Sequence, residues 1–311
     1  MSDTFSVLAT DIFGDELSLA PASLRVRRST DSPAEGMSGS FPVSSAPREI
    51  VRVRVLRGGD QIFEGRPDAQ RLTFSQDGML LTLESRSKGA ILLDNEAMPE
   101  TVHFATTHAM FDRLIGRHGF ILIAPGHTML PEFTVRKGLT LWDAFSIFVR
   151  RIHGRLPFVN GDMVMISQTD PGTNIVIGGA DLPFSRLEHD ISYYNPISRV
   201  FIRDDEGSYS TFVSNPDTAQ RQILRERYLI PAGEFAAVPR WDSLSRIRRS
   251  MRQMRSVQVT LPGYHEIRPG RGIVIEHPQI FLPNLLLDRL DFTLDSNGAR
   301  TQLTLASALY D

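Results

Sequence analysis

The chain has 311 residues, of which 41% are hydrophobic and 23% are charged, and its formal net charge at pH 7 is −2. This length predicts two or three folded units, and this composition is typical of globular proteins rather than of disordered chains. The near-neutral balance excludes a general electrostatic attraction to nucleic acid but leaves a local basic face open. Because there is no cysteine, disulfides, thiolate catalysis and cysteine-ligated metal centres are excluded.

The basic residues are almost all arginine. Lys88 and Lys137 are the two lysines among 34 basic residues. Arginine is favoured in buried and interfacial ion pairs because its planar guanidinium binds a carboxylate through two hydrogen bonds. A genome rich in G and C would produce the same bias, so both explanations stay open.

The first residues lack the basic and apolar pattern of a signal peptide. No stretch approaches the roughly 18 consecutive apolar residues that a helix needs to cross a bilayer. We therefore expect a protein that folds in a cytoplasm and does not insert into a membrane.

Residues 1–87 have the pattern of five or six short strands that form a small barrel or sandwich. Val51, Val53 and Val55 recur at every second position, which is typical of a half-buried strand. Gly58 and Gly78 lie in the turns of two expected hairpins. Two other strands are expected at 5–9 and 24–28, and one long flexible loop is expected at 29–39.

Residues 88–170 change to an α/β pattern. Apolar residues from Phe104 to Ile115 recur at helical spacing, and His108 lies on the same face. Thr140 is expected to cap a second helix, which carries Trp142 and ends at Gly154. A β-hairpin is expected to follow at 155–166.

Residues 171–311 return to strands, interrupted by a helical insert at about 216–254. A hairpin is expected at 197–213, and closing strands at 257–261, 272–276, 285–292 and 301–306. Gly298 belongs to a strong turn signal before the last strand. A buried helical stripe is expected from Trp241, Leu244, Ile247, Met251 and Met254.

No motif predicts a cofactor or metal site, and we expect none. The segment His265-Glu266-Ile267-Arg268-Pro269 lacks the second histidine of a zincin motif, because Pro269 stands one helical turn after His265. Gly270-Arg271-Gly272 lacks the third glycine, the strand and the helix of a dinucleotide site. Met37-Ser38-Gly39 is not a nucleophile elbow, and there is no phosphate-binding glycine loop.

Asp204, Asp205 and Glu206 form the best candidate for paired carboxylates. Their spacing matches no calcium loop, and we interpret them as the solvated tip of a hairpin. We interpret His108 as a core or interface residue rather than a base. Because glycosidase carboxylates cannot be recognised in a sequence, an enzyme is not excluded by these observations.

The helix at 240–255 carries arginines on its polar sides and could neutralise phosphates. It lacks the interleaved exposed aromatic residues of many single-strand binders. We therefore interpret its polar sides as a solvated face or an ion-pairing interface.

Three stretches carry a more specific pattern in their order and spacing. The C-terminal one runs from Val257–Tyr264 through the glycine turn at Arg268–Gly272 and Pro283-Asn284 to two strands. These two strands are Leu286–Phe292 and Gly298–Leu305. The two earlier stretches are Ser85–Asp94 and Gly138–Phe145.

In these stretches the chain resembles the late control protein D type of hub protein from the baseplate of contractile phage tails. The likeness covers the chain from about residue 50 to its end as a pattern rather than as close identity. Tyr264 stands where Trp is more usual in that family, and Ser87 stands where an acidic residue is common.

The resemblance implies a non-enzymatic structural protein of the α+β class, mainly β. It implies two tail-tube-like β-barrel domains at 1–87 and 171–311, separated by an α/β insert domain at 88–170. The expected structural turns and core positions are Gly58, Gly78, Trp142, Trp241, Gly263, Tyr264, Gly270 and Gly298.

The resemblance also implies a homotrimer whose six barrels bind the six-fold tail tube on one side and the three-fold spike on the other. Baseplate wedge proteins would surround it, and DNA would pass through its lumen without specific binding. It would be assembled in the cytoplasm of a bacterial host and would reside in the tail baseplate of a virion or a related injection machine.

Two other classes of function stay open. A tail-associated cell-wall hydrolase would need two carboxylates roughly 5–9.5 Å apart in a cleft. A carbohydrate-binding baseplate module would need an exposed aromatic platform, for which Trp142 and Trp241, both on expected apolar stripes, offer little.

Overall fold

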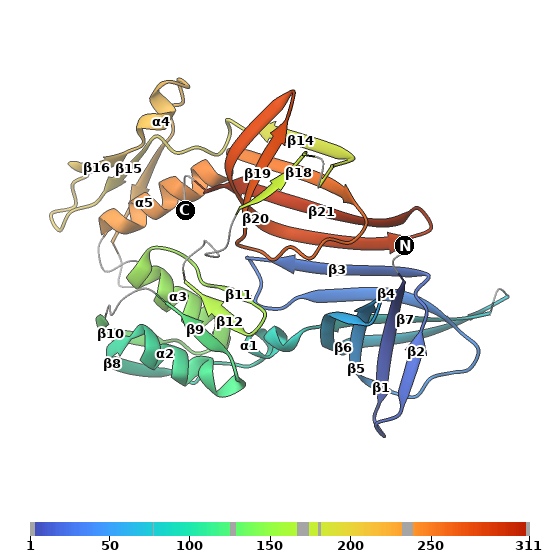
Figure 1. The fold of residues 1–311 in the computed structure, drawn as a ribbon. Coiled ribbons are helices and arrows are strands. Elements are labelled where there is room, and N and C mark those ends of the chain that lie inside the picture. The colour runs from blue at the N-terminus through green and yellow to red at the C-terminus, as the bar shows by residue number, and fades with distance from the viewer. Residues whose placement is uncertain are drawn as a thin grey trace.

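A computed structural model describes residues 4–76, 78–124, 129–166, 174–179, 182–231 and 239–308 (Figure 1). The strands are β1 (Phe5–Asp11), β2 (Glu16–Leu19), β3 (Ser23–Ser29), β4 (Gly36–Val43), β5 (Ile50–Arg57), β6 (Asp60–Ser75), β7 (Gly78–Arg86), β8 (Glu100–Thr106), β9 (Ile121–Ile123), β10 (Met129–Val135), β11 (Phe158–Asn160), β12 (Met163–Met165), β13 (Ile175–Ile177), β14 (Arg186–Ile191), β15 (Arg199–Ile202), β16 (Thr211–Ser214), β17 (Glu226–Leu229), β18 (Arg255–Pro262), β19 (Gly272–His277), β20 (Ile280–Asp295) and β21 (Gly298–Ser307). The helices are α1 (Ile91–Asp94), α2 (Thr107–Leu114), α3 (Leu141–His153), α4 (Pro216–Ala219) and α5 (Pro239–Arg252), with 3-10 turns at Lys88–Ala90 and Gly116–His118.

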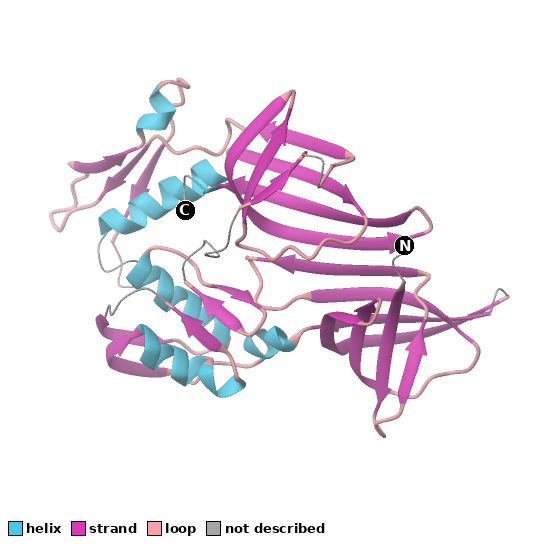
Figure 2. Cartoon of the chain, in the orientation of Figure 1, coloured by secondary structure: helices cyan, strands magenta, loops and turns pink. Residues whose placement is uncertain are grey.

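Most of the strands belong to one sheet that is built from both ends of the chain. Its order is β14-β18-β21-β20-β3-β4-β7-β6-β5-β1-β2, and β19 joins β13 to β20 beside this path. Among the described strands the path stays open, because β14 and β2 at its two ends do not pair with each other. Strands dominate the molecule and the helices lie mainly to one side (Figure 2). The expected α+β, mainly β class is confirmed.

The junction between the two ends of the chain is the antiparallel pair β3 and β20. Their register runs from Ser29 opposite Arg289 to Leu24 opposite Leu294. Arg25 Nη2 lies 2.8 Å and Arg27 Nε 2.9 Å from the same oxygen, Oδ1 of Asp291. Two cations and one carboxylate thus bridge the ladder on one face, while the other face carries apolar residues of both strands and the buried Arg28.

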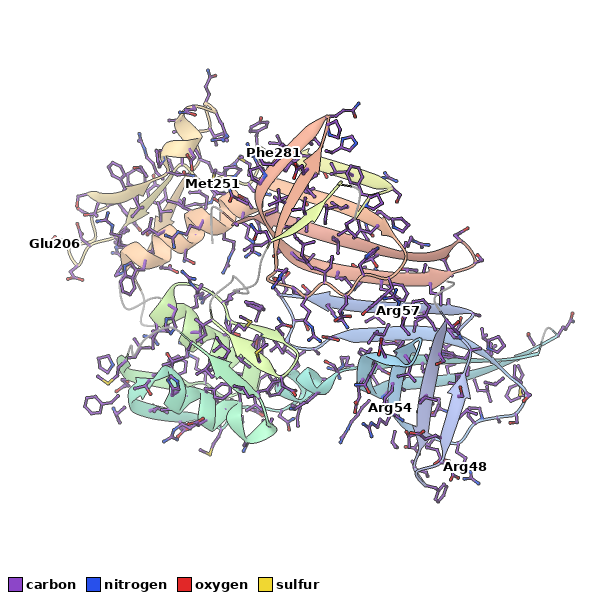
Figure 3. All side chains as sticks on the ribbon, viewed as in Figure 1. Arg48, Arg54, Arg57, Glu206, Met251 and Phe281 are labelled. Carbon is purple, nitrogen blue, oxygen red and sulfur yellow. The ribbon has the colours of Figure 1, made fainter. Side chains whose placement is uncertain are left out.

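One hydrophobic core lies behind this junction. The rings of Phe5 and Tyr264 each have their centre 5.0 Å from that of Phe292. The Arg57 guanidinium, labelled in Figure 3, lies 5.2 Å from the centre of the Tyr264 ring. Buried side chains of the first strands and the last strands belong to the same cluster. The two ends of the chain therefore fold against each other.

Arg28 ties three distant segments of this core together. The residue is 3% exposed, its Nε lies 3.2 Å from Glu35 and its Nη1 3.0 Å from Glu266, and its Nη2 donates to the carbonyl of Ile62. The Tyr264 hydroxyl donates to the same carboxylate of Glu266. Burial alone would raise the pKa of Glu266, but the charge of Arg28 and the Tyr264 hydroxyl outweigh burial and lower that pKa.

The middle of the chain folds as a unit with its own core of β8–β10, β9–β12–β11, α2 and α3. Thr140 caps α3 as predicted, since its hydroxyl accepts a hydrogen bond of 3.0 Å from the Asp143 N–H. Gly154 ends the helix in the left-handed conformation, also as predicted. The predicted hairpin appears as β11 paired with β12.

Lys88 fastens this middle unit at its entrance. Its Nζ donates to the carbonyl of Gly119 at 2.7 Å and to Asp162 at 3.0 Å. The same ammonium lies 4.7 Å from the centre of the Phe120 ring. One amine therefore joins the 3-10 turn that follows β7 to two loops of the unit.

A third, small core lies between α5 and the sheet β16-β15-β17. Val200 and Leu229 of the sheet and Ile247, Met251 and Met254 of the helix segment form it. The segment 216–254 thus contains β17 as well as helices, so the expectation of a purely helical insert was incomplete. A four-residue strand is too short to show alternation clearly in a sequence.

Three local expectations were wrong. Phe104 lies in β8 rather than in a helix and is 70% exposed, because α2 begins at Thr107. The expected loop at 29–39 is shorter, since β4 begins at Gly36 and pairs with β3. Trp241 is 48% exposed rather than buried. It lies in the first turn of α5, and a helix of 14 residues, about 21 Å long, extends past strands of four residues, about 13 Å long.

We predict that Arg28→Met lowers the free energy of unfolding by about 3 kcal/mol, because it leaves partly buried carboxylates and a carbonyl without their cation. The matched control is Arg52→Met, which removes an exposed pair with Glu64 and should cost under about 1 kcal/mol. Urea unfolding of both variants measures the difference. Equal losses in the two variants would contradict the structural role given to Arg28.

We also predict that Met251→Ala lowers the free energy of unfolding by about 3 kcal/mol, since the Met251 side chain is fully buried in the third core. Trp241→Ala should cost about 1 kcal/mol, because the residue is already 48% exposed. Thermal unfolding followed by circular dichroism tests the ranking. A larger loss for the tryptophan variant would mean that α5 is docked on its other face.

Candidate functional site

The five glycines expected at turns all have a positive φ, at Gly58 (57°), Gly78 (114°), Gly263 (80°), Gly270 (83°) and Gly298 (96°). Gly298 is the first residue of β21 and directly follows the turn after β20. A side chain at this position would strain the backbone. The turn residue Asp77 lies outside the described residues. These positions shape the sheet and carry no chemistry of their own.

The three expected aromatic positions have different surroundings. Trp142 is 7% exposed within the middle unit, and Tyr264 is 4% exposed at the junction of the two ends. Burial raises the pKa of the Tyr264 hydroxyl well above its ordinary value, although the Arg28 charge opposes this shift. Trp241 is the exposed one, so it is a surface residue and not part of a core.

Among the catalytic candidates, Asp204 has structural partners. Asp204 closes its own hairpin loop, since its Oδ1 accepts a hydrogen bond of 2.6 Å from the Ser208 N–H. Glu206 lies at the outer tip of that hairpin (Figure 3). His108 is exposed on α2, so its expected place in a core was wrong, and its place at an interface stays a prediction.

The zincin look-alike is also accounted for. His265 and Glu266 lie in the loop between β18 and β19, not on a helix. The His265 Nε2 lies 2.8 Å from the carbonyl of Pro262, and Glu266 binds Arg28. Within the described residues, no group of three or more His, Asp or Glu side chains is arranged to hold a metal ion.

The first surface that the fold assembles is an aromatic platform on the outer face of the sheet β16-β15-β17. Phe201 stands opposite Phe212 on one side and Tyr228 on the other. Its ring centre lies 5.5 Å from that of Phe212 and 5.4 Å from that of Tyr228, with which it stacks at 17°. The Tyr209 ring meets Tyr228 edge-on at 5.2 Å. We call these four residues the aromatic platform.

A polar edge borders the aromatic platform. Arg199 lies 3.6 Å from Glu226, and its guanidinium is 5.5 Å from the centre of the Phe212 ring. Phe212 is 49% and Tyr228 59% exposed. A flat aromatic surface beside a charged pair can pack against an apolar group and bind a polar one at once.

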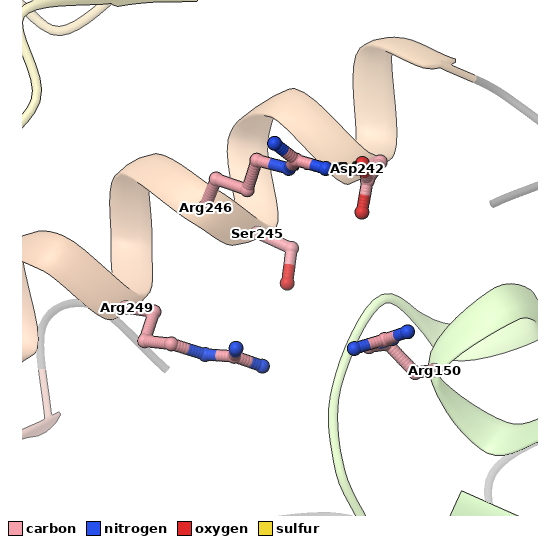
Figure 4. A pocket seen from close by; sticks show the side chains of 5 residues that line it. All are labelled: Arg150, Asp242, Ser245, Arg246 and Arg249. Carbon is pink, nitrogen blue, oxygen red and sulfur yellow. Dashed lines mark hydrogen bonds and ion pairs between the residues drawn. The ribbon is translucent and has the colours of Figure 1, made fainter. Parts of the chain in front are cut away.

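The second surface is a recess of about 280 Å³ between α3 and α5, lined by Arg150, Asp242, Ser245, Arg246 and Arg249. Figure 4 shows the Arg150 and Arg249 side chains pointing toward each other across it, with Ser245 between them. Arg246 forms an ion pair of 3.1 Å with the buried Asp242. We call these five residues the arginine recess.

Neither surface was predicted from the sequence. The signals were present in part, because aromatic residues stood in the expected hairpin at 197–213 and arginines stood on the helix at 240–255. The sequence did not show which residues these would contact, because Tyr228 and Arg150 come from segments distant along the chain. Strand register and helix docking bring them together.

The fold is that of phage tail proteins. The tail protein from Neisseria meningitidis MC58 is similar to this chain with a TM-score of 0.81 and 16% identity, over 99% of this chain and 97% of that one. The 43 kDa tail protein of prophage MuSo2 from Shewanella oneidensis has a TM-score of 0.81 and 13% identity, over 99% of both chains.

A more distant likeness extends to a component of the type VI secretion system of E. coli, with a TM-score of 0.55 and 10% identity over 98% of this chain and 74% of that one. No family model matches the chain, and no curated protein matches it. The resemblance drawn from the sequence is confirmed at the level of the fold. Among the described residues, no helix is both long and apolar enough to cross a membrane.

Proposed function

We propose that this chain is a structural hub subunit in the baseplate of a contractile tail, from a phage or a related injection machine. The observation that carries the proposal is the likeness to two tail proteins at a TM-score of 0.81 over nearly their whole length. Both inserts are included in that likeness, because 99% of this chain is covered.

In this proposal three copies form a ring between the six-fold tail tube and the three-fold spike, with wedge proteins around it and DNA passing through its lumen. The strands of 1–87 and of 171–311 supply one tube-like module each. Three copies therefore supply six modules, one for each subunit of the six-fold tube. The antiparallel pairing of β3 with β20 supports this arrangement, because it joins the two modules within one copy. The inserts at 88–170 and about 216–254 lie to one side of both modules (Figure 1).

We propose no catalytic role for the chain. The Asp204 carboxylate, the best candidate in the sequence, stabilises its own loop through Ser208 and Ser210. Glu266 is committed to Arg28 and Tyr264 within the core. Their partners account for these carboxylates without a reaction.

A second candidate function is the binding of bacterial surface saccharides, favoured by the aromatic platform. Sugar rings present C–H faces that pack on exposed aromatic rings and hydroxyl groups that bind charged side chains. Phe201, Phe212 and Tyr228 offer the rings, and Arg199 and Glu226 offer the charges. Such binding is compatible with the hub role, since it uses the small sheet β16-β15-β17 rather than the main sheet.

We predict that the purified chain forms a homotrimer, alone or with its spike protein. For the chain alone, light scattering should give a mass of about three times the 34.8 kDa of one chain, and in the mixture the mass of the bound spike is added. Such a ring should be stable because obligate interfaces bury on the order of 2,000–5,000 Å². A strict monomer at high concentration, with and without spike, would contradict the hub proposal.

For the second candidate we predict that replacing Phe212 and Tyr228 together by alanine weakens binding to polysaccharide from the host surface about tenfold, because each stacked ring contributes about 0.5–1.5 kcal/mol. Phe74→Ala is the control, since Phe74 is 68% exposed on a different part of the molecule. Isothermal calorimetry with lipopolysaccharide and peptidoglycan fragments measures the affinity. Unchanged affinity in the double variant would exclude the aromatic platform as the site.

A further inference from the structure

The arginine recess holds more positive charge than its own residues neutralise. Arg150, Arg246 and Arg249 line it, and Asp242 is the one carboxylate among the described residues that do so. Asp242 is already engaged with Arg246. In the part of the chain that the structure describes, neither Arg150 nor Arg249 has a hydrogen-bond or ion-pair partner for its guanidinium.

This arrangement is unfavourable as it stands. Burial, and next the like charge of Arg249, lower the pKa of Arg150 below its ordinary value, while Asp242 acts in the opposite direction. An arginine nevertheless stays protonated, so the repulsion persists instead of being relieved by loss of a proton. Two guanidiniums that face one another across a recess are stabilised when an anion with two oxygens lies between them.

We propose that the arginine recess is a binding site for an acidic side chain of a partner protein, whose carboxylate bridges Arg150 and Arg249. The Ser245 hydroxyl, which lies between them, is placed to donate a further hydrogen bond (Figure 4). The proposal rests on the assembly role proposed above, because it assigns to this chain a docking point for a neighbouring subunit. The occupant would also connect two inserts, since Arg150 belongs to α3 and Arg249 to α5.

The chemistry of the recess favours a protein carboxylate over a nucleic acid backbone. A nucleic acid is bound through a row of phosphate contacts or through stacked bases. Here the cations converge on one recess of about 280 Å³, and none of the described side chains that line it is aromatic. The Asp242 carboxylate in the recess would repel a row of adjacent phosphates. A single carboxylate can instead bind Arg150 and Arg249 without contacting Asp242. The planar fork of arginine also matches a carboxylate in shape.

The test measures the binding of hexaglutamate to the full chain at low and at physiological salt, with hexaglutamine and a 20-base-pair DNA duplex beside it. We expect hexaglutamate to bind and to raise the unfolding temperature, and hexaglutamine to do neither. Arg249→Gln and Arg150→Gln should each weaken hexaglutamate about tenfold or more. Because either change relieves repulsion, neither should lower the unfolding temperature of the free protein. Arg52→Gln, whose guanidinium pairs with Glu64 on β6, is the control and should bind as the wild type does.

Three results would overturn the proposal: no binding of hexaglutamate by the wild type at about 1 mM, equal binding by the recess variants, or tighter binding of the duplex that the recess variants abolish. Light scattering on the same samples keeps this inference separate from the hub role. A trimer that ignores hexaglutamate refutes the recess and leaves the hub standing. A chain that stays monomeric with and without its spike protein, yet binds hexaglutamate through Arg150 and Arg249, refutes the hub and leaves the recess as a binding site.

Discussion

The pairing of β3 with β20 is the constraint on which the rest of the molecule depends. Arg25 donates two hydrogen bonds to Asp291 across it, and these two residues are separated by 266 positions in the sequence. Because the sheet on either side continues from these two strands, loss of this ladder would separate the first strands from the last ones. Arg28 and Tyr264 reinforce it from within the core. The inserts then extend from a sheet whose position is already set.

Local signals explain what could be predicted from the sequence. The cap of α3 depends on Thr140 and on residues within three positions of it, and the β11–β12 hairpin depends on one short turn. The closing strands, such as β21, have alternation long enough to be recognised. The order of strands and helices, and the mainly β class, follow from these local patterns.

Contacts between distant segments explain what could not be predicted. The exposure of Trp241 depends on how far β15 and its neighbours extend beneath α5, which the helical spacing of α5 does not contain. Likewise, Phe201 and Tyr228 meet through a parallel register, and Arg150 and Arg249 meet through helix docking. Surfaces made by tertiary contact are thus the part of the site that sequence patterns missed.

The scarcity of lysine has a practical consequence for chemical labelling. Lys88 donates its amine to Gly119 and Asp162, so its nitrogen is held in two hydrogen bonds that labelling would have to break. Lys137 is exposed in the turn between β10 and α3. An amine-reactive dye or cross-linker therefore has one readily available side chain, located on the middle unit. With no cysteine in the chain, any thiol introduced elsewhere would be a second, independent attachment point.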